Sequence, residues 1–460
     1  MKKKLLLAMA VLGAAAWQGA NAIVLKANDN EFANVGLNLQ IWAQNDGKVT
    51  STQHTSNNFS VNDALIYFSG QINPIVQFGA DFEFPVSPSP APYHEGITYA
   101  RVSDAFINFK FMPEFQLMAG LFRDPVSRLT GTDSYTYVIP TGYGYGFDTV
   151  WSELPIYINT TKNQYITNNL SDILNPFETI TIGDIDGMNP PRDAGIAIWG
   201  NVADTMLKYY LFAANGAYDY QSGYNANSNL KYGIRVAFTP TMLGYKNSSG
   251  FGDQDTFLGA LNNLTIDLGY EQQKLDCSGV NANTFNTDPS LYYMCDEGNV
   301  SSLTPKYYNV DAIWEQKFGT FVPQIQLGYA EKQDLMNLGS GNVKSTGYYV
   351  QIAALYDQMV GIGKPGIAFR WDYSKVDNYA YTTVTTNGNS TNTTINSIPS
   401  AKINRYGIFL NYYIAGEAAR ISLGADIVEP DSNLKNVSLP NGGGYLKNFT
   451  DWTLALQTEF

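Results

Sequence analysis

The last thirteen residues of the chain, Asn448–Phe460, are the stretch that most constrains its fold. Alternate positions differ in polarity: Trp452, Leu454, Leu456 and Phe460 fall on one parity, and Asp451, Thr453, Gln457 and Glu459 on the other. Because a strand points alternate side chains to opposite faces, this segment would be apolar on one face and polar on the other. A final strand leaves an open, aggregation-prone edge unless it pairs with the first strand and closes a barrel. A barrel that is apolar outside and polar inside spans a membrane; the alternative is the last strand of a secreted β-sandwich.

The first 22 residues have the pattern of a secretory signal. Lys2–Lys4 form a charged start, Leu5–Ala16 is an apolar run too short to span a bilayer, and Ala20–Ala22 fits an A-x-A cleavage site. We therefore expect residues 1–22 to be removed and residues 23–460 to form one exported domain; a retained anchor is the alternative. We find no other apolar run of 18 or more residues, so any membrane span must be built from strands.

Composition agrees with a membrane barrel. The chain has 32 Tyr, 24 Phe and 41 Gly, yet its mean hydropathy is only −0.19. Many aromatics with moderate hydropathy suit aromatic girdles around a polar lumen. The formal net charge is −13, and without the three lysines of residues 1–22 it is −16. An acidic chain is not expected to bind nucleic acid.

The cysteines and histidines are few. Cys277 and Cys295 are the only cysteines, and we expect them to form a disulfide that staples one external connection of an exported protein. The sequence has no CxxC or CxxCH motif, and its only histidines are His54 and His94. A metal site, a haem, another cofactor or a His-based catalytic triad is therefore not expected, and we do not expect an enzyme.

Period-two alternation predicts about sixteen strands. They are Val35–Ala43, Phe59–Gln71, Ile75–Phe84, Thr98–Phe109, Phe115–Phe122, Arg192–Asn201, Thr205–Asn215, Leu230–Thr239, Leu264–Gln272, Lys306–Phe318, Phe321–Glu331, Thr346–Asp357, Pro365–Val376, Ile403–Ala415, Ala419–Val428 and Asn448–Phe460. An even number is typical of bacterial single-chain barrels, and sixteen strands enclose a lumen wide enough for water. The fold class is thus all-β, a transmembrane antiparallel β-barrel.

The connections alternate in length. The odd-numbered ones are long and polar, as expected on the external side, and they include Lys274–Pro305 and Asp377–Lys402. The even-numbered ones are mostly short, although Pro240–Asn263 is too long for a periplasmic turn and is unexplained. The third external connection, Arg123–Pro191, has no clear strand pattern, and such long connections are usually functional.

Several ordered segments resemble the phosphate-selective porin family of the O and P type. They are FSVNDALIYFSGQINP (Phe59–Pro74), VSDAFINF (Val102–Phe109), LMAGLFRDPVSRLTGTDSYTYV (Leu117–Val138), PPRDAGIAIWGNV (Pro190–Val202) and KYYLFAANG (Lys208–Gly216). In the third segment, Gly120, Phe122, Pro125, Ser127 and Thr130 stand at positions comparable to the family's motif. The resemblance covers roughly Phe59–Thr239. It implies a homotrimeric outer-membrane porin of sixteen strands, in contact with outer-membrane lipid, whose third loop folds inward to narrow the pore. The terminal strand also resembles the aromatic strand with which bacterial outer-membrane barrels generally end, which implies that Phe460 is an assembly signal.

The third connection departs from that family. Its only basic residues are Arg123, Arg128 and Lys162, against eight acidic ones. We predict that the pore constriction, within residues 123–191, is formed by Arg123, Asp124, Arg128, Asp133, Tyr135, Tyr137, Asp148 and Glu153. Arg123 and Arg128 could contact a passing anion or pin the loop to the wall through a carboxylate such as Asp104 or Asp124. The tyrosines could line the constriction or pack the loop.

Charged side chains on the polar parity of the strands should face the lumen, because an Arg or Lys on the lipid face costs about 2–4 kcal/mol at the bilayer midplane. This rule predicts a lumen wall that includes Asp104, Lys208, Lys231, Arg235, Arg370, Asp372, Arg405 and Arg420. These charges could set ion preference, or they could pair across the lumen and hold its shape.

We expect a passive channel for small hydrophilic solutes and ions, with weak selectivity and no tight phosphate site. The alternatives are an anion- or phosphate-selective channel, as in the resembled family, and a plugged structural or adhesive surface barrel. An outer-membrane barrel enzyme would need a nucleophile and a base. The two histidines, both in external connections, make that improbable.

Overall fold

The structure is a computed structural model that describes residues 23–28, 30–84, 101–159, 164–167, 174–179, 192–216, 229–279, 295, 300–335, 342–387, 390–439 and 443–460. Residues 1–22, which were predicted to be a secretory signal, and His94 and Lys162 lie outside the described residues. Within them, no helix is long and apolar enough to cross a membrane.

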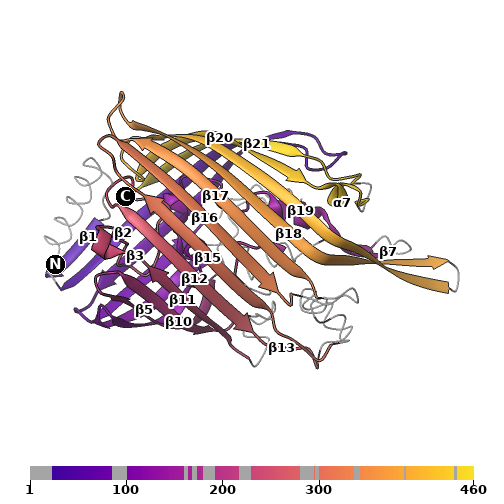
Figure 1. Ribbon diagram of the computed structural model, residues 1–460, viewed down its shortest axis with the longest axis horizontal. Helices are drawn as coiled ribbons and strands as arrows, with labels where there is room; N and C mark the ends of the chain where they lie inside the picture. Colours follow the sequence, from indigo (N-terminus) through magenta and orange to yellow (C-terminus); the bar gives the residue numbers. More distant parts are fainter. Residues whose placement is uncertain are drawn as a thin grey trace, which may run out of the picture.

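Sixteen antiparallel strands form a closed barrel (Figure 1). In chain order they are β2 (Glu31–Asp46), β3 (Ser56–Gln71), β4 (Val76–Glu83), β5 (Arg101–Met112), β6 (Phe115–Arg123), β9 (Arg192–Val202), β10 (Leu207–Ala214), β11 (Lys231–Phe238), β12 (Asn263–Gln273), β15 (Lys306–Glu315), β16 (Phe321–Gln333), β17 (Lys344–Tyr356), β18 (Lys364–Asn387), β19 (Ser390–Tyr413), β20 (Ala419–Pro430) and β21 (Phe449–Glu459). Each strand pairs with its sequence neighbours among these sixteen. The predicted all-β barrel is confirmed.

The last strand closes the barrel against the first, as its alternation predicts. β21 pairs with β2 from Asn38↔Glu459 to Asn45↔Trp452. At the end of the seam, Leu37 N donates to Phe460 O at 2.9 Å, and Phe460 N donates to Leu37 O at 3.0 Å. The C-terminal strand therefore has no open edge along this seam.

The two faces of the strands differ as a membrane barrel requires. On β21, Trp452 is 55% exposed and Leu456 44%, whereas Thr453 between them is fully buried. β20 repeats the pattern, with Leu423 exposed and Ser422 buried. Apolar side chains thus point outward toward lipid and polar ones point inward.

Two strands are much longer than the sequence predicts. β18 and β19 pair up to Asn387↔Ser390, with one interruption at Asn378 and Pro399, so most of the predicted external loop Asp377–Lys402 is a β-hairpin. Threonine and asparagine are the commonest residues of this stretch, and its threonines favour strands, although its polarity on both faces hides the alternation. The hairpin projects beyond the barrel (Figure 1). Its projecting part lies beyond Asp377 on β18 and before Ser400 on β19, where the pairing of β18 with β17 has ended, and is called the arm below. β7 (Pro155–Asn159) pairs in parallel with β18 along the arm, and β8 (Gln164–Thr167) pairs with β7.

The third loop folds into the barrel, which confirms its predicted inward course. It carries α2 (Arg128–Gly131), η1 (Ser134–Thr136) and α3 (Phe147–Glu153). Ser127 begins α2 with a capping box, in which its hydroxyl accepts from Thr130 N. Phe147, Val150 and Trp151 on α3 are fully buried. The Trp151 ring packs against Tyr379 of β18, with ring centroids 5.8 Å apart.

The long connection between β11 and β12 also folds inward, which explains its unexpected length. This segment, residues 239–262, is called the insert below; it begins with η2 (Thr241–Leu243). It enters from the end of the barrel where β1 (Ile23–Asn28) and the C-terminus lie (Figure 1). The insert meets the third loop: Asp253 N donates to Gly131 O at 2.9 Å, and Asp133 N donates to Asp253 O at 3.3 Å.

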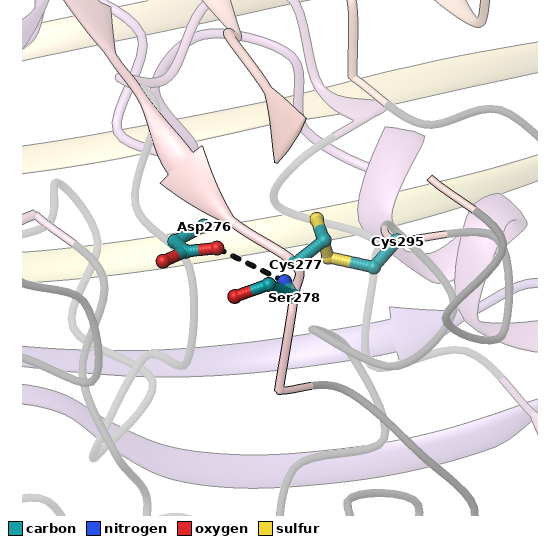
Figure 2. Close-up of a disulfide and its surroundings, with 4 residues drawn as sticks. All are labelled: Asp276, Cys277, Ser278 and Cys295. Carbon is teal, nitrogen blue, oxygen red and sulfur yellow. Dashed lines mark hydrogen bonds between the residues drawn. A yellow bond between two sulfur atoms is a disulfide. The ribbon is translucent and has the colours of Figure 1, made fainter. Parts of the chain in front are cut away.

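A disulfide joins Cys277 and Cys295 in the connection between β12 and β15, with an Sγ–Sγ distance of 2.04 Å (Figure 2). Next to it, β13 (Leu275–Asp276) pairs with β14 (Ser302–Leu303). Ser278 N donates to Asp276 Oδ1 at 2.9 Å, as Figure 2 shows. Both cysteines are buried in the apolar cluster that includes the third loop.

Candidate functional site: the barrel interior

Arginines of the barrel wall hold the third loop by its backbone. Arg370 on β18 and Arg405 on β19 both donate from Nη1 to Gly142 O, at 2.5 and 2.6 Å. Arg420 on β20 donates from Nη1 to Tyr137 O at 2.6 Å. Two amides add to this row, from Gln457 Nε2 to Tyr135 O and from Asn411 Nδ2 to Val138 O, each at 2.8 Å. The inward arginines therefore act as anchors for residues 135–142 of the loop.

Arg405 and a further wall arginine, Arg235, pair with carboxylates. Arg405 lies 2.6 Å from both Asp372 and Asp426. Arg235 on β11 lies 2.5 Å from Asp253 of the insert and 2.6 Å from Asp267 on β12. All of these side chains are buried. A buried charge is tolerated when it is paired and hydrogen-bonded, so these groups form compact neutralised clusters.

The wall lysines are buried in similar clusters. Lys231 on β11 pairs with Asp124 of the third loop and, at 3.0 Å, with Asp193 on β9. Lys208 on β10 lies 3.9 Å from Asp253. Asp104 on β5 pairs with Arg192 on β9 at 3.3 Å. The predicted wall residues all point inward, and protein rather than open water covers most of them.

Arg123 and Arg128, at the start of the third loop, brace that loop. Arg123 Nη1 donates to Thr132 O at 2.9 Å and pairs with Asp133 at 2.8 Å. Arg128 Nε donates to Asp311 on β15 at 3.2 Å. Neither ion pair uses the carboxylates that the sequence suggested, because Asp104 and Asp124 pair with Arg192 and Lys231 instead.

The tyrosines of the third loop pack against it and against arginines. The Tyr137 and Tyr143 rings meet edge to face, with centroids 5.6 Å apart. The guanidinium of Arg370 lies 3.8 Å from the centre of the Tyr143 ring. Tyr135 OH lies 3.5 Å from Asp133 Oδ2. Such contacts combine apolar burial with cation–π attraction.

Two predicted constriction residues lie apart from this network, on α3. Asp148 Oδ2 accepts from Asn175 Nδ2 at 3.4 Å. Glu153 Oε1 accepts from Gln53 Nε2 at 2.9 Å in an exposed contact with the first external connection. The structure therefore brings Arg123, Arg128 and Asp133 together near the insert, and it places Asp148 and Glu153 with other loop segments.

Asp255, inside the barrel between the third loop and the wall strands β16–β18, is the main residue that the sequence analysis missed. It lies on the insert and is fully buried. Its Oδ2 accepts from Val138 N at 2.8 Å, and its Oδ1 accepts from Gln326 Nε2 at 3.0 Å. Burial alone would raise the pKa of Asp255, but Arg370, Arg128 and hydrogen bonds from the Tyr143 hydroxyl and the Val138 amide hold that pKa below its ordinary value. The anomalous length of the 240–263 connection was the one available signal.

A second group of residues that the sequence analysis missed is acidic and partly exposed to water. Asp63 on β3 and Asp81 and Glu83 on β4 are of intermediate burial, and the Asp133 side chain is 35% exposed. Ser134 of the third loop donates to Asp63 at 3.4 Å, which places this group on the inner face beside that loop. The alternation of Asp81, Phe82 and Glu83 was the signal that could have found it.

Comparisons with known proteins add information on the fold. No protein-family model matches the sequence, and no curated protein matches it. Among solved structures, the chain is similar to OmpF of Salmonella typhi in complex with daunomycin (TM-score 0.50, 14% identity), covering 95% of this chain and 100% of that one. It is also similar to a high-pH structure of OprB of Pseudomonas putida (TM-score 0.51, 10% identity), covering 93% of this chain and 94% of that one. The finer resemblance to phosphate-selective porins stays a prediction. At these identities the likeness concerns architecture: the chain has a general porin fold, the closed sixteen-stranded barrel of bacterial outer-membrane proteins.

Proposed function

We propose that the protein is an outer-membrane porin-like channel for small hydrophilic solutes and ions, with weak selectivity that favours cations. One observation carries this proposal. The wall arginines are engaged by backbone carbonyls and carboxylates, while carboxylates of β3, β4 and the third loop keep contact with water.

The electrostatic reason is simple. A buried arginine paired with two carboxylates presents little positive field to a passing ion. Partly exposed carboxylates in a narrow passage raise the local cation concentration and repel anions, an effect that salt screens over about 8–10 Å. Rings of such charges set ion preference in pores.

The phosphate-selective alternative needs basic groups that are free to bind phosphate. Arg123 and Arg128 are both engaged within the third loop and its wall contacts. The plugged-barrel alternative has one observation in its favour, which is that the insert and the third loop meet inside the barrel. A homotrimer, expected from the resembled family, and an assembly role for Phe460, expected from outer-membrane barrels in general, belong to the same proposal.

Planar-bilayer recording tests the proposal. We expect discrete conductance steps and a reversal potential in a potassium chloride gradient whose sign reports modest cation preference. Absence of any steps from correctly assembled protein would favour the plugged barrel. Block of chloride current by low phosphate concentrations, lost when Arg123 and Arg128 are changed to Ala, would favour the phosphate-selective channel.

A further inference from the structure

The carboxylate of Asp255 occupies a ready-made anion-binding cradle. Three donors contact it directly besides the Val138 N–H: the hydroxyl of Tyr143, the amide of Gln326 at 3.0 Å and the amide of Gln351 at 3.3 Å. The guanidiniums of Arg128 and Arg370 lie 3.7 and 4.0 Å from its two oxygens. Except for Asp255, every member belongs to the third loop or to the wall strands β16, β17 and β18.

The two glutamines are oriented by the arginines. Gln326 Oε1 accepts from Arg128, and Gln351 Oε1 accepts from Arg370, so each Nε2 is turned toward Asp255. Gln326 Nε2 also donates to the Asp255 backbone oxygen at 2.8 Å, and Gln351 Nε2 also donates to Gln324 Oε1 at 3.0 Å. Among the described residues, Asp311 is the other carboxylate in ion-pair contact with Arg128, at 3.2 Å; Asp253 and Asp267 lie farther from it and also feel its charge. With Asp255 removed, the ion-pair contacts within 4.0 Å of the two guanidiniums would be reduced to one, from Arg128 to Asp311, and four neutral donors would remain. That arrangement favours binding of one negative charge.

Asp255 does not accept a hydrogen bond from every donor of the two arginines. Arg128 Nη1 and Arg370 Nε are buried and make no hydrogen bond within the described part of the chain. The two ion-pair distances are also longer than direct hydrogen bonds.

We propose, building on the channel function above, that this cradle is a binding site for the carboxylate group of a small organic acid. Asp255 is its built-in occupant, which a free carboxylate displaces together with the middle of the insert. A cavity of about 510 Å³ borders the insert, lined among others by Asn247, Gln254 and Glu417, and gives the displaced segment room. The solutes that this channel handles would then include small carboxylic acids.

The first test uses the unmodified protein in detergent, with succinate as the probe and sodium chloride at equal ionic strength as the reference. Asp253 N and Asp255 N are hydrogen-bonded to Gly131 O and Thr136 Oγ1, each at 2.9 Å. Saturating succinate should speed hydrogen exchange of these two amides at least about tenfold, because displacement opens both bonds. Unchanged exchange under saturating succinate would overturn the displacement.

The second test is calorimetric titration of succinate into variants. Asp255→Asn removes the competing charge, so affinity should rise at least about tenfold if Asp255 fills the cradle in 90% or more of molecules. Adding Arg370→Gln should remove the gain. The matched control is Asp426→Asn, which also deletes a buried carboxylate beside a wall arginine but leaves the cradle intact. Equal gains in Asp426→Asn and Asp255→Asn, or no gain in Asp255→Asn, would overturn the site.

Assembly of each variant is checked by its heat-dependent shift in gel electrophoresis. If a variant fails to assemble, the hydrogen-exchange measurement on the unmodified protein decides the proposal instead. Binding in detergent does not depend on conductance. Succinate binding without conductance steps would therefore retain the cradle and reject the channel. Conductance steps without succinate binding would retain the channel and reject the cradle.

Discussion

Arg405 illustrates how single residues are used inside this barrel. Strand parity predicts that Arg405 points inward, and it does. Strand parity cannot tell whether water or protein lies on the inner side. Arg405 donates there to Gly142 O, which is 263 residues distant in the chain, and no local pattern encodes such a contact. The same limit applies to Arg370 and Arg420. The direction of the wall charges was therefore predictable from sequence, whereas their partners were not.

Neutralising Arg405 should be strongly destabilising. Arg405→Gln leaves Asp372 and Asp426 as buried carboxylates without their shared partner, and removing one member of a buried pair typically costs about 3–5 kcal/mol. We expect a clearly lower unfolding temperature in detergent, measured by heat-dependent gel migration. Combining Arg405→Gln with Asp372→Asn and Asp426→Asn should recover much of the loss. A single variant as stable as the parent would show that these ion pairs do not matter for stability.

The terminal residue Phe460 acts through two parts of its structure. Its backbone exchanges two hydrogen bonds with Leu37, and its side chain is 41% exposed on the outer surface. Deleting Phe460 removes both bonds, each worth about 0.5–1.5 kcal/mol, whereas Phe460→Ala keeps them. We expect both changes to lower the assembled fraction without reducing export, and deletion to be the more severe. The measurement is the ratio of folded to exported protein in outer-membrane fractions. Normal assembly of both variants would contradict a role for the terminus.

At the scale of elements, alternation located the strands, but it failed where both faces are polar or where a connection folds inward. The sixteen predicted strands all correspond to barrel strands. The arm was missed because its Thr- and Asn-rich strands have no apolar face. The inward course of the insert was missed because it depends on contacts with Gly131 and Asp133, which no local pattern encodes.

The arm should be dispensable for barrel assembly. Tyr379 and Ile398 are paired partners across β18 and β19, so residues 380–397 can be replaced by an Asn-Gly turn that suits a two-residue hairpin. The barrel register below this point is unaffected, and the bond from Tyr379 OH to Pro155 O remains. We expect unchanged heat-dependent migration and unchanged conductance. Loss of assembly would mean that the arm is needed to nucleate the pairing of β18 with β19.

Across the whole molecule, acidic groups that contact water should dominate the selectivity of the passage. Burial, opposed by Arg123, raises the pKa of Asp133 on the third loop above its ordinary value. A raised pKa means that this carboxylate loses its charge at a higher pH than an unperturbed one. Cation preference should therefore decrease as pH falls from 8 to 4. Reversal potentials in a potassium chloride gradient measure it, and Asp133→Asn should reduce the pH dependence. A cation preference that grows on acidification would contradict the proposed role of these carboxylates.

The oligomeric state is a second property of the whole molecule that can be measured. We expect the purified protein to migrate as an oligomer without heating and as a monomer after boiling, consistent with the trimer that the resembled family implies. Light scattering in detergent gives the mass of the unheated species. A monomer at all temperatures would remove the trimer, though not the barrel.

The arm determines which part of the protein an approaching molecule meets first. Beyond Asp377 and Ser400, where the barrel pairing of β18 with β17 ends, about ten residues of each strand continue outward. At about 3.4 Å per residue this is roughly 35 Å, a reach comparable to the thickness of the hydrocarbon core that the barrel spans. An antibody, a phage or a neighbouring cell approaching from outside would touch a ribbon of threonine, asparagine and serine before it reached the mouth of the barrel. Variation in the sequence of this ribbon could then change how the bacterium is recognised while the interior stays the same.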